Sequence, residues 1–350
     1  MSFFKDMLKD SESLFLNEIA LDPEFMPKEV PYRENQQHHI AECIKPLVQG
    51  RTGKHLFITG SPGIGKTLAI KHIFRELQEE TNDVIPLYIN CWKKDTGFRI
   101  VSEICEQIGY TWTHNKKTDE LFRDILKILN KKAVVICFDE CDKAKELDIL
   151  YSFIEDLFKK SILFVTNESN WMATLDSRIK SRLNLERLEF KPYTLEETRG
   201  ILKKRIEYAF GSSIVEKDAF DFIVEKTFET GDIRKGLFLL RESGLRAENK
   251  SLKKILLEHA QDALRSGSFV VKNSADFDPE ERDILNLIKE HSGKTMRELF
   301  DLHPGEKSYR TFQRKIGDLK RNKLVIYTPA EDGQSVRVSY NPTLTEYQKN

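Results

Sequence analysis

The sequence predicts an α/β fold with a parallel β-sheet, followed by an all-helical unit and a C-terminal unit of three helices and a β-hairpin. Short apolar runs alternate with helical patterns between residues 29 and 190, which is typical of a parallel sheet with crossover helices. A glycine-rich turn links the first apolar run to a helical pattern, and the apolar runs stop after Pro192. The predicted strands are Leu56–Thr59, Val84–Ile89, Ala133–Phe138 and Ile162–Thr166.

The glycine-rich turn has the form G-x-x-x-x-G-K-[ST], with Gly60, Gly65, Lys66 and Thr67 in the fixed places. Such a turn points backbone N–H groups at an anion, and the positive end of the following helix supports them. We expect Lys66 to reach the β- and γ-phosphates of a nucleotide and Thr67 to bind Mg²⁺. The predicted phosphate-binding residues are Gly60, Gly63, Ile64, Gly65, Lys66 and Thr67, and the predicted cofactors are ATP or ADP with Mg²⁺.

Polar residues end two of the later strands. Asp139 follows an apolar run and is placed to hold Mg²⁺, and the adjacent Glu140 is placed to polarise water as a general base. Asn167 ends the next strand, where its amide can position that water. The alternatives are a solvated strand end for the carboxylates and a turn residue for Asn167.

Arginines supply the remaining candidate charges. Arg178 and Arg182 are four residues apart and share one helix face, where one of them can act as an arginine finger across a protomer boundary. We choose Arg182 first and Arg178 second; the alternative is a solvated basic helix end. Arg234 lies in the first turn of a predicted helix, where a cation opposes the helix dipole, so a γ-phosphate is its expected partner. The predicted catalytic residues are Lys66, Glu140, Asn167 and Arg182.

The chain divides into five expected segments. An N-terminal arm, 1–28, lies over the first domain, which is the nucleotide-binding base, 29–190. A helical lid, 191–265, begins at a capping box of Thr194 and Glu197, whose helix runs to about Phe210, and continues with helices near 216–228, 232–247 and 251–265. A linker, 266–278, rich in Ser, Gly and Asn, leads to the C-terminal unit, 279–350.

Composition limits the class of protein. Lys and Arg total 56, as do Asp and Glu, so a nucleic-acid surface requires local segregation of charge. The five cysteines include no C-x-x-C pair, and the eight histidines show no metal-ligand spacing, so we expect reduced thiols without a zinc site. His38 and His39 are expected on an ordinary helix face. With charges in its first ten residues and no run of about 18 apolar residues, the chain is expected to be soluble and cytoplasmic.

The ordered motifs resemble the AAA+ ATPases, and among them the archaeal Orc/Cdc-type replication initiators. The resemblance covers about residues 20–265 and is carried by FMPKEVPYRENQ, GSPGIGKT, LYINCW, CFDE, FVTN, KPYTLEETRGILKKR and GDIRKGL. It implies an AAA+ base and lid, a weak Mg-dependent ATPase activity, and a nucleotide pocket lined by Tyr193 and Arg205. It also implies that the segment 93–104, with Arg99, enters DNA. The family is often basic overall, whereas this chain is neutral.

Three helices followed by a hairpin predict a C-terminal winged helix-turn-helix, with an Asp332-Gly333 turn in the hairpin. Phe312, Ile316 and Leu319 form the expected buried stripe of the third helix. Residues 307–323 contain seven Lys or Arg and one Asp, a local charge of +6, which suits DNA. The candidate DNA-binding residues of this unit are Tyr309, Arg310, Gln313, Arg314, Lys320, Arg321 and Lys323. The alternative is a solvated basic helix in a protein-docking winged helix.

Together these features predict an ATP-dependent, nucleoid-associated DNA replication initiator. It would bind double-stranded origin DNA, and its ATP or ADP state would control its conformation and helicase recruitment. Other initiator protomers are expected partners, and a membrane is not. The alternative is a nucleotide-gated protein–protein module, such as a helicase loader, clamp loader or signalling AAA+ ATPase.

Overall fold

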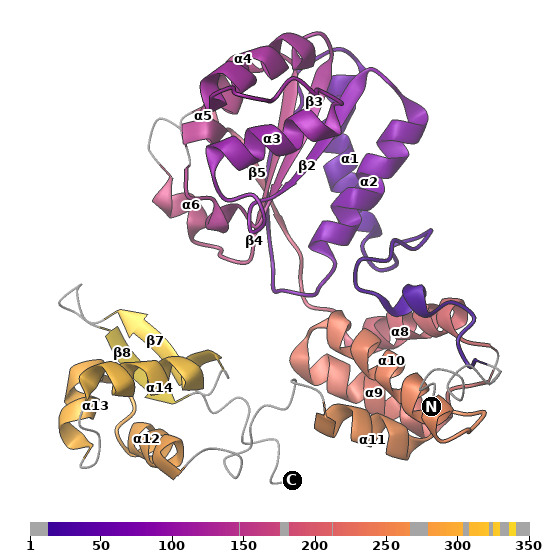
Figure 1. Cartoon of the computed structure of the whole chain (residues 1–350), viewed down its shortest axis with the longest axis vertical. Helices are drawn as coiled ribbons and strands as arrows, with labels where there is room; N and C mark the ends of the chain where they lie inside the picture. Colours follow the sequence, from indigo (N-terminus) through magenta and orange to yellow (C-terminus); the bar gives the residue numbers. More distant parts are fainter. Residues whose placement is uncertain are drawn as a thin grey trace, which may run out of the picture. The chain divides into compact units, whose positions relative to one another are not determined.

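The computed structural model describes residues 13–146, 148–175, 182–211, 213–266, 279–303, 308–321, 325–329 and 336–340. The chain forms two compact units, residues 1–263 and 264–350 (Figure 1). Over the described ranges, the helices are too short or too polar to cross a membrane.

The first unit contains a parallel β-sheet with the strand order β2-β3-β4-β1-β5. Its strands are β1 (His55–Thr59), β2 (Val84–Asn90), β3 (Ala133–Asp139), β4 (Lys160–Thr166) and β5 (Leu185–Glu189). The four predicted strands are confirmed within a residue or two. The edge strand β5 was not predicted, because its sequence LERLE has only two apolar residues and forms no apolar run.

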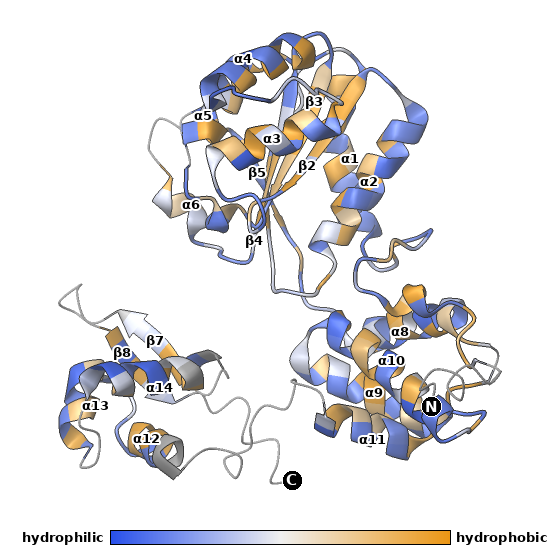
Figure 2. Cartoon of the chain, in the orientation of Figure 1, coloured by the Kyte–Doolittle hydropathy of each residue, from blue (hydrophilic) through white to orange (hydrophobic). Residues whose placement is uncertain are grey.

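Helices cover both faces of this sheet, as the apolar strands of Figure 2 require. One face packs against α1 (Glu34–Val48) and α2 (Lys66–Glu80). The other packs against α3 (Gly97–Gln107), α4 (Thr118–Leu129) and α5 (Asp148–Asp156), near the short α6 (Trp171–Thr174) and η2 (Cys141–Lys143). Along β3, Val134 and Ile136 face the α3 side and Val135 faces the α1 side, so the central strand is buried on both faces.

The lid is built from α8 (Leu195–Ala209), α9 (Lys217–Thr230), α10 (Ile233–Asn249) and α11 (Leu257–Ser266). The predicted capping box is present: the Glu197 N–H donates to Thr194 Oγ1 at 3.2 Å, and the Thr194 N–H donates to Glu197 Oε2 at 2.8 Å. The last helix begins at Leu257 and not at residue 251, because Ile255 forms a parallel bridge with Val215.

The N-terminal arm packs against the lid with its first half and against the base with its second half, so the expected contact with the base is only part of its course. The Leu16 N–H donates to the Ala209 carbonyl at 2.9 Å, and the Phe15 and Phe210 rings lie 4.8 Å apart. The short helix η1 (Glu18–Leu21) follows on the same surface. Gly244 permits this contact, since a side chain there would collide with the Phe15 ring. The arm reaches the base further along, where Lys71 Nζ donates to Glu24 Oε2 at 3.2 Å and His72 Nε2 donates to the Lys28 carbonyl at 2.8 Å.

The second unit contains α12 (Pro279–Glu290), β6 (Lys294–Thr295), α13 (Met296–Leu302), α14 (Tyr309–Arg321), β7 (Val325–Pro329) and β8 (Val336–Tyr340). Its strands pair antiparallel in the order β6-β8-β7, so three helices and a hairpin occur in the predicted order. Phe312, Ile316 and Leu319 form the buried stripe of α14, as predicted. The Asp332-Gly333 turn lies outside the described residues.

Two leucines of the arm test its contact with the lid. Leu14 is 8% exposed and Leu16 is 74% exposed. Leu14→Ala should reduce the free energy of unfolding by about 2–3 kcal/mol, because it leaves a cavity. Leu16→Ala should change it by about 0.5 kcal/mol or less. Differential scanning calorimetry should therefore show a melting temperature about 4–10 °C lower for the first variant alone. Equal effects of the two substitutions would mean that the arm does not pack on the lid in solution.

Candidate nucleotide site

A cavity of about 430 Å³ lies at the edge of the sheet where β1, β3 and β4 end. The carboxyl edge of a parallel sheet is where such folds bind ligands. The base and the lid both contribute to its walls. Its lining includes most of the predicted pocket residues: Gly63, Gly65, Lys66, Thr67, Asp139, Glu140, Asn167, Tyr193, Arg205 and Arg234.

The ammonium group of Lys66 lies at the centre of the phosphate loop. Its Nζ donates to the Gly60 carbonyl at 2.7 Å, to the Ser61 carbonyl at 2.8 Å and to Asn167 Oδ1 at 2.8 Å. Burial lowers the pKa of Lys66 to about 8, and the nearby Asp139 carboxylate partly opposes this change. The loop therefore holds a partly buried cation that an anion would stabilise, and Asn167 is linked directly to it.

The two predicted metal ligands are in contact. Thr67 Oγ1 donates to Asp139 Oδ2 at 2.5 Å, and Tyr88 donates to the same oxygen at 2.7 Å. A hydroxyl and a carboxylate are the oxygen ligands that Mg²⁺ prefers. Sequence reasoning missed Tyr88; its signal was a polar hydroxyl inside the apolar run of β2. Burial and the Asp139 charge raise the pKa of Tyr88, so it remains a hydrogen-bond donor.

Glu140 occupies a left-handed backbone conformation with φ of 52° directly after β3. Burial raises the pKa of its carboxyl group, and the neighbouring Asp139 charge raises it further. A carboxylate with a raised pKa accepts a proton more readily, which suits a general base. Glu140 and Asp139 line the same cavity, so the candidate general base lies next to the predicted metal ligand.

The lid meets the phosphate loop at the start of α10. The Ile233 N–H donates to the Gly63 carbonyl at 3.2 Å, and the Asp232 carboxylate fills the space that a side chain at position 63 would need. Arg234 Nε donates to Asp232 Oδ1 at 2.9 Å. Arg234 therefore has a local anionic partner, so its place in the first turn of α10 does not by itself indicate a phosphate. Asp232 is a second residue that sequence reasoning missed.

Two further predicted residues are buried around the cavity. The Tyr193 hydroxyl lies close to Gly65, whose φ of 87° and short distance to that hydroxyl exclude a side chain. Arg205 donates to the backbone carbonyls of Ala20 at 3.0 Å and Phe25 at 3.3 Å, so it also fixes the arm. The predicted residues Gly60 and Ile64 do not line the cavity.

Arg33 is the third residue that sequence reasoning missed. It is buried directly before α1, where its Nε donates to the Ile64 carbonyl at 3.1 Å and its second guanidinium nitrogen donates to the Lys191 carbonyl at 2.7 Å. The guanidinium also lies 3.8 Å from the centroid of the Tyr193 ring. A cation at the start of a helix, the argument used for Arg234, was the available signal.

Comparison with known proteins shows the family to which the chain belongs. Residues 49–168 match the model of an AAA domain, and residues 199–265 match the Cdc6 AAA+ ATPase-type lid domain. The ORC1-type DNA replication protein 1 of Sulfurisphaera tokodaii is 35% identical over 71% of this chain and 66% of its own length. That of Archaeoglobus fulgidus is 31% identical over 76% of this chain and 68% of its own length. The chain belongs to the Orc/Cdc6 family of AAA+ replication initiators.

This membership confirms the resemblance seen in the sequence. A solved structure of the Aeropyrum pernix ORC1 protein in complex with DNA has the same fold, with a TM-score of 0.70 and 24% identity. The match covers 95% of this chain and 94% of that one.

Two predicted residues of this Orc/Cdc6 initiator lie away from the cavity lining. Arg182 is exposed, forms an ion pair with Glu155 and lies 5.7 Å from the centroid of the Tyr151 ring. Arg99, on α3, is exposed and forms an ion pair with Asp95 at 2.9 Å. Arg178 lies outside the described residues.

In the second unit of the initiator, Arg310, Gln313 and Arg314 are exposed on one helix, α14. Tyr309 is half-buried, with its ring 5.1 Å from that of Phe300, and Lys320 lies 4.0 Å from the centroid of the Tyr327 ring. Lys315 is buried, so one of the seven basic residues does not lie on the exposed face. Lys323 and the side chain of Arg321 lie outside the described residues.

The lowered pKa of Lys66 predicts how ATP affinity depends on pH. Lys66 carries its proton below about pH 8 and loses it above that value. A bound phosphate stabilises the ammonium form, so binding takes up a proton at higher pH. Affinity should therefore be constant below about pH 7 and weaken by up to about tenfold per pH unit above pH 8. Calorimetric titration from pH 6.5 to 9.5 measures this; a flat profile would show that Lys66 stays charged throughout.

Proposed function

We propose that this replication initiator binds ATP and ADP in the cavity between base and lid, and uses the nucleotide state to control its conformation at origin DNA. The supporting observation is the convergence on one cavity of Lys66, the Thr67–Asp139 pair, Glu140 and the lid residue Arg234. These residues come from three separate sequence motifs. Together they provide side chains that can bind phosphate, hold a metal ion and activate water.

In this proposal, the phosphate loop binds the nucleotide anion. Lys66 exchanges its carbonyl and amide acceptors for the β- and γ-phosphates, while the N–H groups of residues 63–67 face the same anion. Thr67 and Asp139 would hold Mg²⁺, and Tyr88 orients the Asp139 carboxylate by donating to one of its oxygens. The metal supplies charge neutralisation at the phosphates. Tyr193 and Arg205 form the side of the cavity toward the lid.

Hydrolysis to ADP and phosphate is expected to be weak in a single protomer. Glu140 would act as general base on water, and Asn167, hydrogen-bonded to Lys66 at 2.8 Å, would position that water. Arg182 would act as a finger on a neighbouring protomer, since it is exposed and does not line its own cavity. Complete charge neutralisation then requires two initiator protomers.

The contact of the lid with the phosphate loop would change with the nucleotide state. Arg234 is paired with Asp232 beside Gly63, and a γ-phosphate would compete with Asp232 for the Arg234 guanidinium. Exchange of one anion for the other changes the contact between α10 and the phosphate loop, which changes the angle between lid and base. We propose that this change governs recruitment of the replicative helicase.

Duplex DNA would bind through two surfaces. The exposed Arg310, Gln313 and Arg314 of α14 would face the major groove, where Arg reads guanine and Gln reads adenine. Lys320, Arg321 and Lys323 would contact phosphates, and Tyr309 would support the start of the helix. Arg99 on α3 would supply the second surface. The Aeropyrum pernix ORC1 protein, which has the same fold, was solved in complex with DNA.

The nucleotide assignment is tested by two substitutions. Lys66→Ala should abolish measurable ATP binding, because the loop loses its phosphate cation. Glu140→Gln should keep ATP affinity within about threefold, while hydrolysis falls by about 100-fold or more, as expected when a general base is lost. Equilibrium binding and phosphate release measure the two effects. Glu80→Gln, at an exposed carboxylate at the end of α2, is the matched control. Wild-type turnover by Glu140→Gln would show that Glu140 is not the base.

The DNA assignment is tested by exposed basic residues of α14. Arg310→Ala or Arg314→Ala should cost about 1–3 kcal/mol on a preferred site if the arginine contacts guanine. Lys320→Ala should weaken binding to all sequences alike and reduce the salt dependence, as expected for a phosphate contact. Fluorescence anisotropy with the full chain measures both, and Arg51→Ala, at an exposed arginine of the first unit, is the control. Unchanged DNA binding by an Arg310→Glu, Arg314→Glu, Lys320→Glu variant would favour a protein-docking role for this unit.

A further inference from the structure

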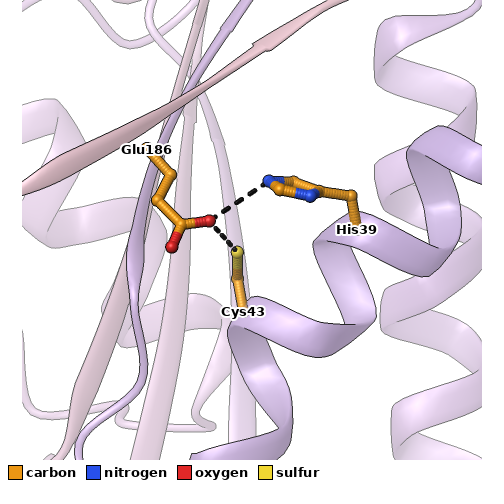
Figure 3. Close-up of side chains that lie close together, drawn as sticks. All are labelled: His39, Cys43 and Glu186. Carbon is orange, nitrogen blue, oxygen red and sulfur yellow. Dashed lines mark hydrogen bonds and ion pairs between the residues drawn. The ribbon is translucent and has the colours of Figure 1, made fainter.

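Three potential metal ligands meet at the edge of the sheet, on the face covered by α1 and outside the nucleotide cavity (Figure 3). His39 and Cys43 lie on α1, and Glu186 lies on the edge strand β5. Their ligand atoms all lie within 4.8 Å of one another. The group contains an imidazole, a thiol and a carboxylate.

The fold brings these side chains together for simple geometric reasons. His39 and Cys43 are four residues apart, so they lie one above the other on a single helix face. Along β5, Glu186 and Leu188 project to the same face of the sheet because side chains alternate along a strand. Leu188 packs in the core cluster under α1, which fixes the direction of Glu186 as well.

Two of the three distances between the ligand atoms match those of a tetrahedral site. Glu186 Oε2 lies 3.3 Å from His39 Nε2 and 3.6 Å from Cys43 Sγ. Zinc binds nitrogen and oxygen at about 2.0–2.2 Å and sulfur at about 2.3 Å, so neighbouring tetrahedral ligands lie roughly 3.3–3.6 Å apart. One ion could therefore contact Oε2 together with either neighbour after small side-chain movements.

Two features of the group indicate a ligand. The His39 Nε2 atom is buried, and its contact with Glu186 Oε2 at 3.3 Å lacks the geometry of a hydrogen bond. The other oxygen of Glu186, Oε1, accepts from Lys54 Nζ at 2.8 Å, so Oε2 is the oxygen turned toward His39 and Cys43. An outer partner of this kind orients the carboxylate that binds a metal. A metal ion would give Nε2 a directed bond in place of this contact.

We propose that His39, Cys43 and Glu186 form a binding site for a zinc-class divalent cation, with water as the fourth ligand. The thiolate and the carboxylate together neutralise a divalent ion, and the mixed nitrogen, sulfur and oxygen set favours zinc over Mg²⁺, which requires oxygen ligands. The His39 and Glu186 side chains are 40% and 36% exposed, which gives solvent access to the site. The Cys43 thiol loses its proton to solvent when the metal–sulfur bond forms.

The bound cation joins α1 to β5, two segments separated by most of the base domain in the sequence. The same two segments also meet near the nucleotide, where Arg33, directly before α1, donates to the carbonyl of Lys191, just after β5. The metal therefore braces the helix and strand that carry the Arg33 contact. This proposal is independent of the assignment of nucleotide and DNA.

Cobalt substitution tests the site in the full-length, reduced and metal-free protein. Titration with Co²⁺ should produce a thiolate-to-cobalt charge-transfer band that saturates at one ion per chain, and Zn²⁺ should displace it. Cys43→Ser should abolish the band, whereas Cys105→Ser, at another buried cysteine of the same domain, should retain it. The predicted Mg²⁺ site at Thr67 and Asp139 has no thiol ligand, so it does not contribute to this signal.

A second variant shows whether a lost signal comes from the missing ligand or from a misfolded protein. Glu186→Gln keeps the shape and an oxygen for Lys54 but removes the anionic ligand, so Co²⁺ affinity should fall by about 100-fold, while ATP affinity stays unchanged. Zn²⁺ should also raise the melting temperature of the wild-type protein and leave that of Cys43→Ser unchanged. The absence of a thiolate band in the wild-type protein, or its persistence in Cys43→Ser, would overturn the proposal.

Discussion

The buried guanidinium of Arg33 connects the parts of the first unit on which nucleotide binding depends. It donates to the carbonyl of Ile64 in the phosphate loop and to the carbonyl of Lys191 at the start of the lid connection. It also lies against the Tyr193 ring at 3.8 Å. A buried carbonyl that loses its donor costs about 1–3 kcal/mol, so the loop and the connection are both tied to this one side chain. Lysine cannot replace it, because it lacks the planar fork of donors.

Further contacts connect Arg33 and Tyr193 to the lid and to the N-terminal arm. Tyr193 precedes the capping box that begins α8, and Arg205 on α8 holds the arm through the carbonyls of Ala20 and Phe25. The arm then returns to α2, the helix that begins with Lys66, through His72 and the Lys28 carbonyl. Phosphate loop, lid and arm are therefore joined by a continuous series of contacts.

Local sequence patterns were sufficient for much of this structure. Buried strands such as β3 form continuous apolar runs, and Thr194 with Glu197 marks a helix start by its own hydrogen bonds. The edge strand β5 could not be found in this way, because it has only one leucine on each face and its pairing partner β1 is distant in the sequence. No local pattern brought His39, Cys43 and Glu186 together either, since Glu186 lies on that strand.

Some residues of the candidate site could also be predicted from the sequence, and others could not. The phosphate loop and the acidic strand end were visible because their residues are contiguous, and their proximity follows from parallel strand order. Arg33, Tyr88 and Asp232 act through contacts with residues far along the chain, so the sequence could mark Arg33 and Tyr88 as unusual but could not name their partners. The local partner of Arg234 was missed although Asp232 is only two residues away, because an N-cap carboxylate can turn either to its helix or to a neighbouring arginine.

The ATP affinity of Arg33→Lys, compared with that of Arg123→Lys, tests the central role of the Arg33 contact most directly. Arg123 also donates to a backbone carbonyl, that of Asp119 at 3.2 Å, but it is exposed and far from the loop in sequence. The account predicts that Arg33→Lys weakens ATP binding by about 5–100-fold, the equivalent of about 1–3 kcal/mol, in a protein that remains folded. Arg123→Lys should bind as the wild type does. Wild-type ATP affinity in a folded Arg33→Lys protein would contradict the claim that this side chain sets the geometry of the nucleotide site.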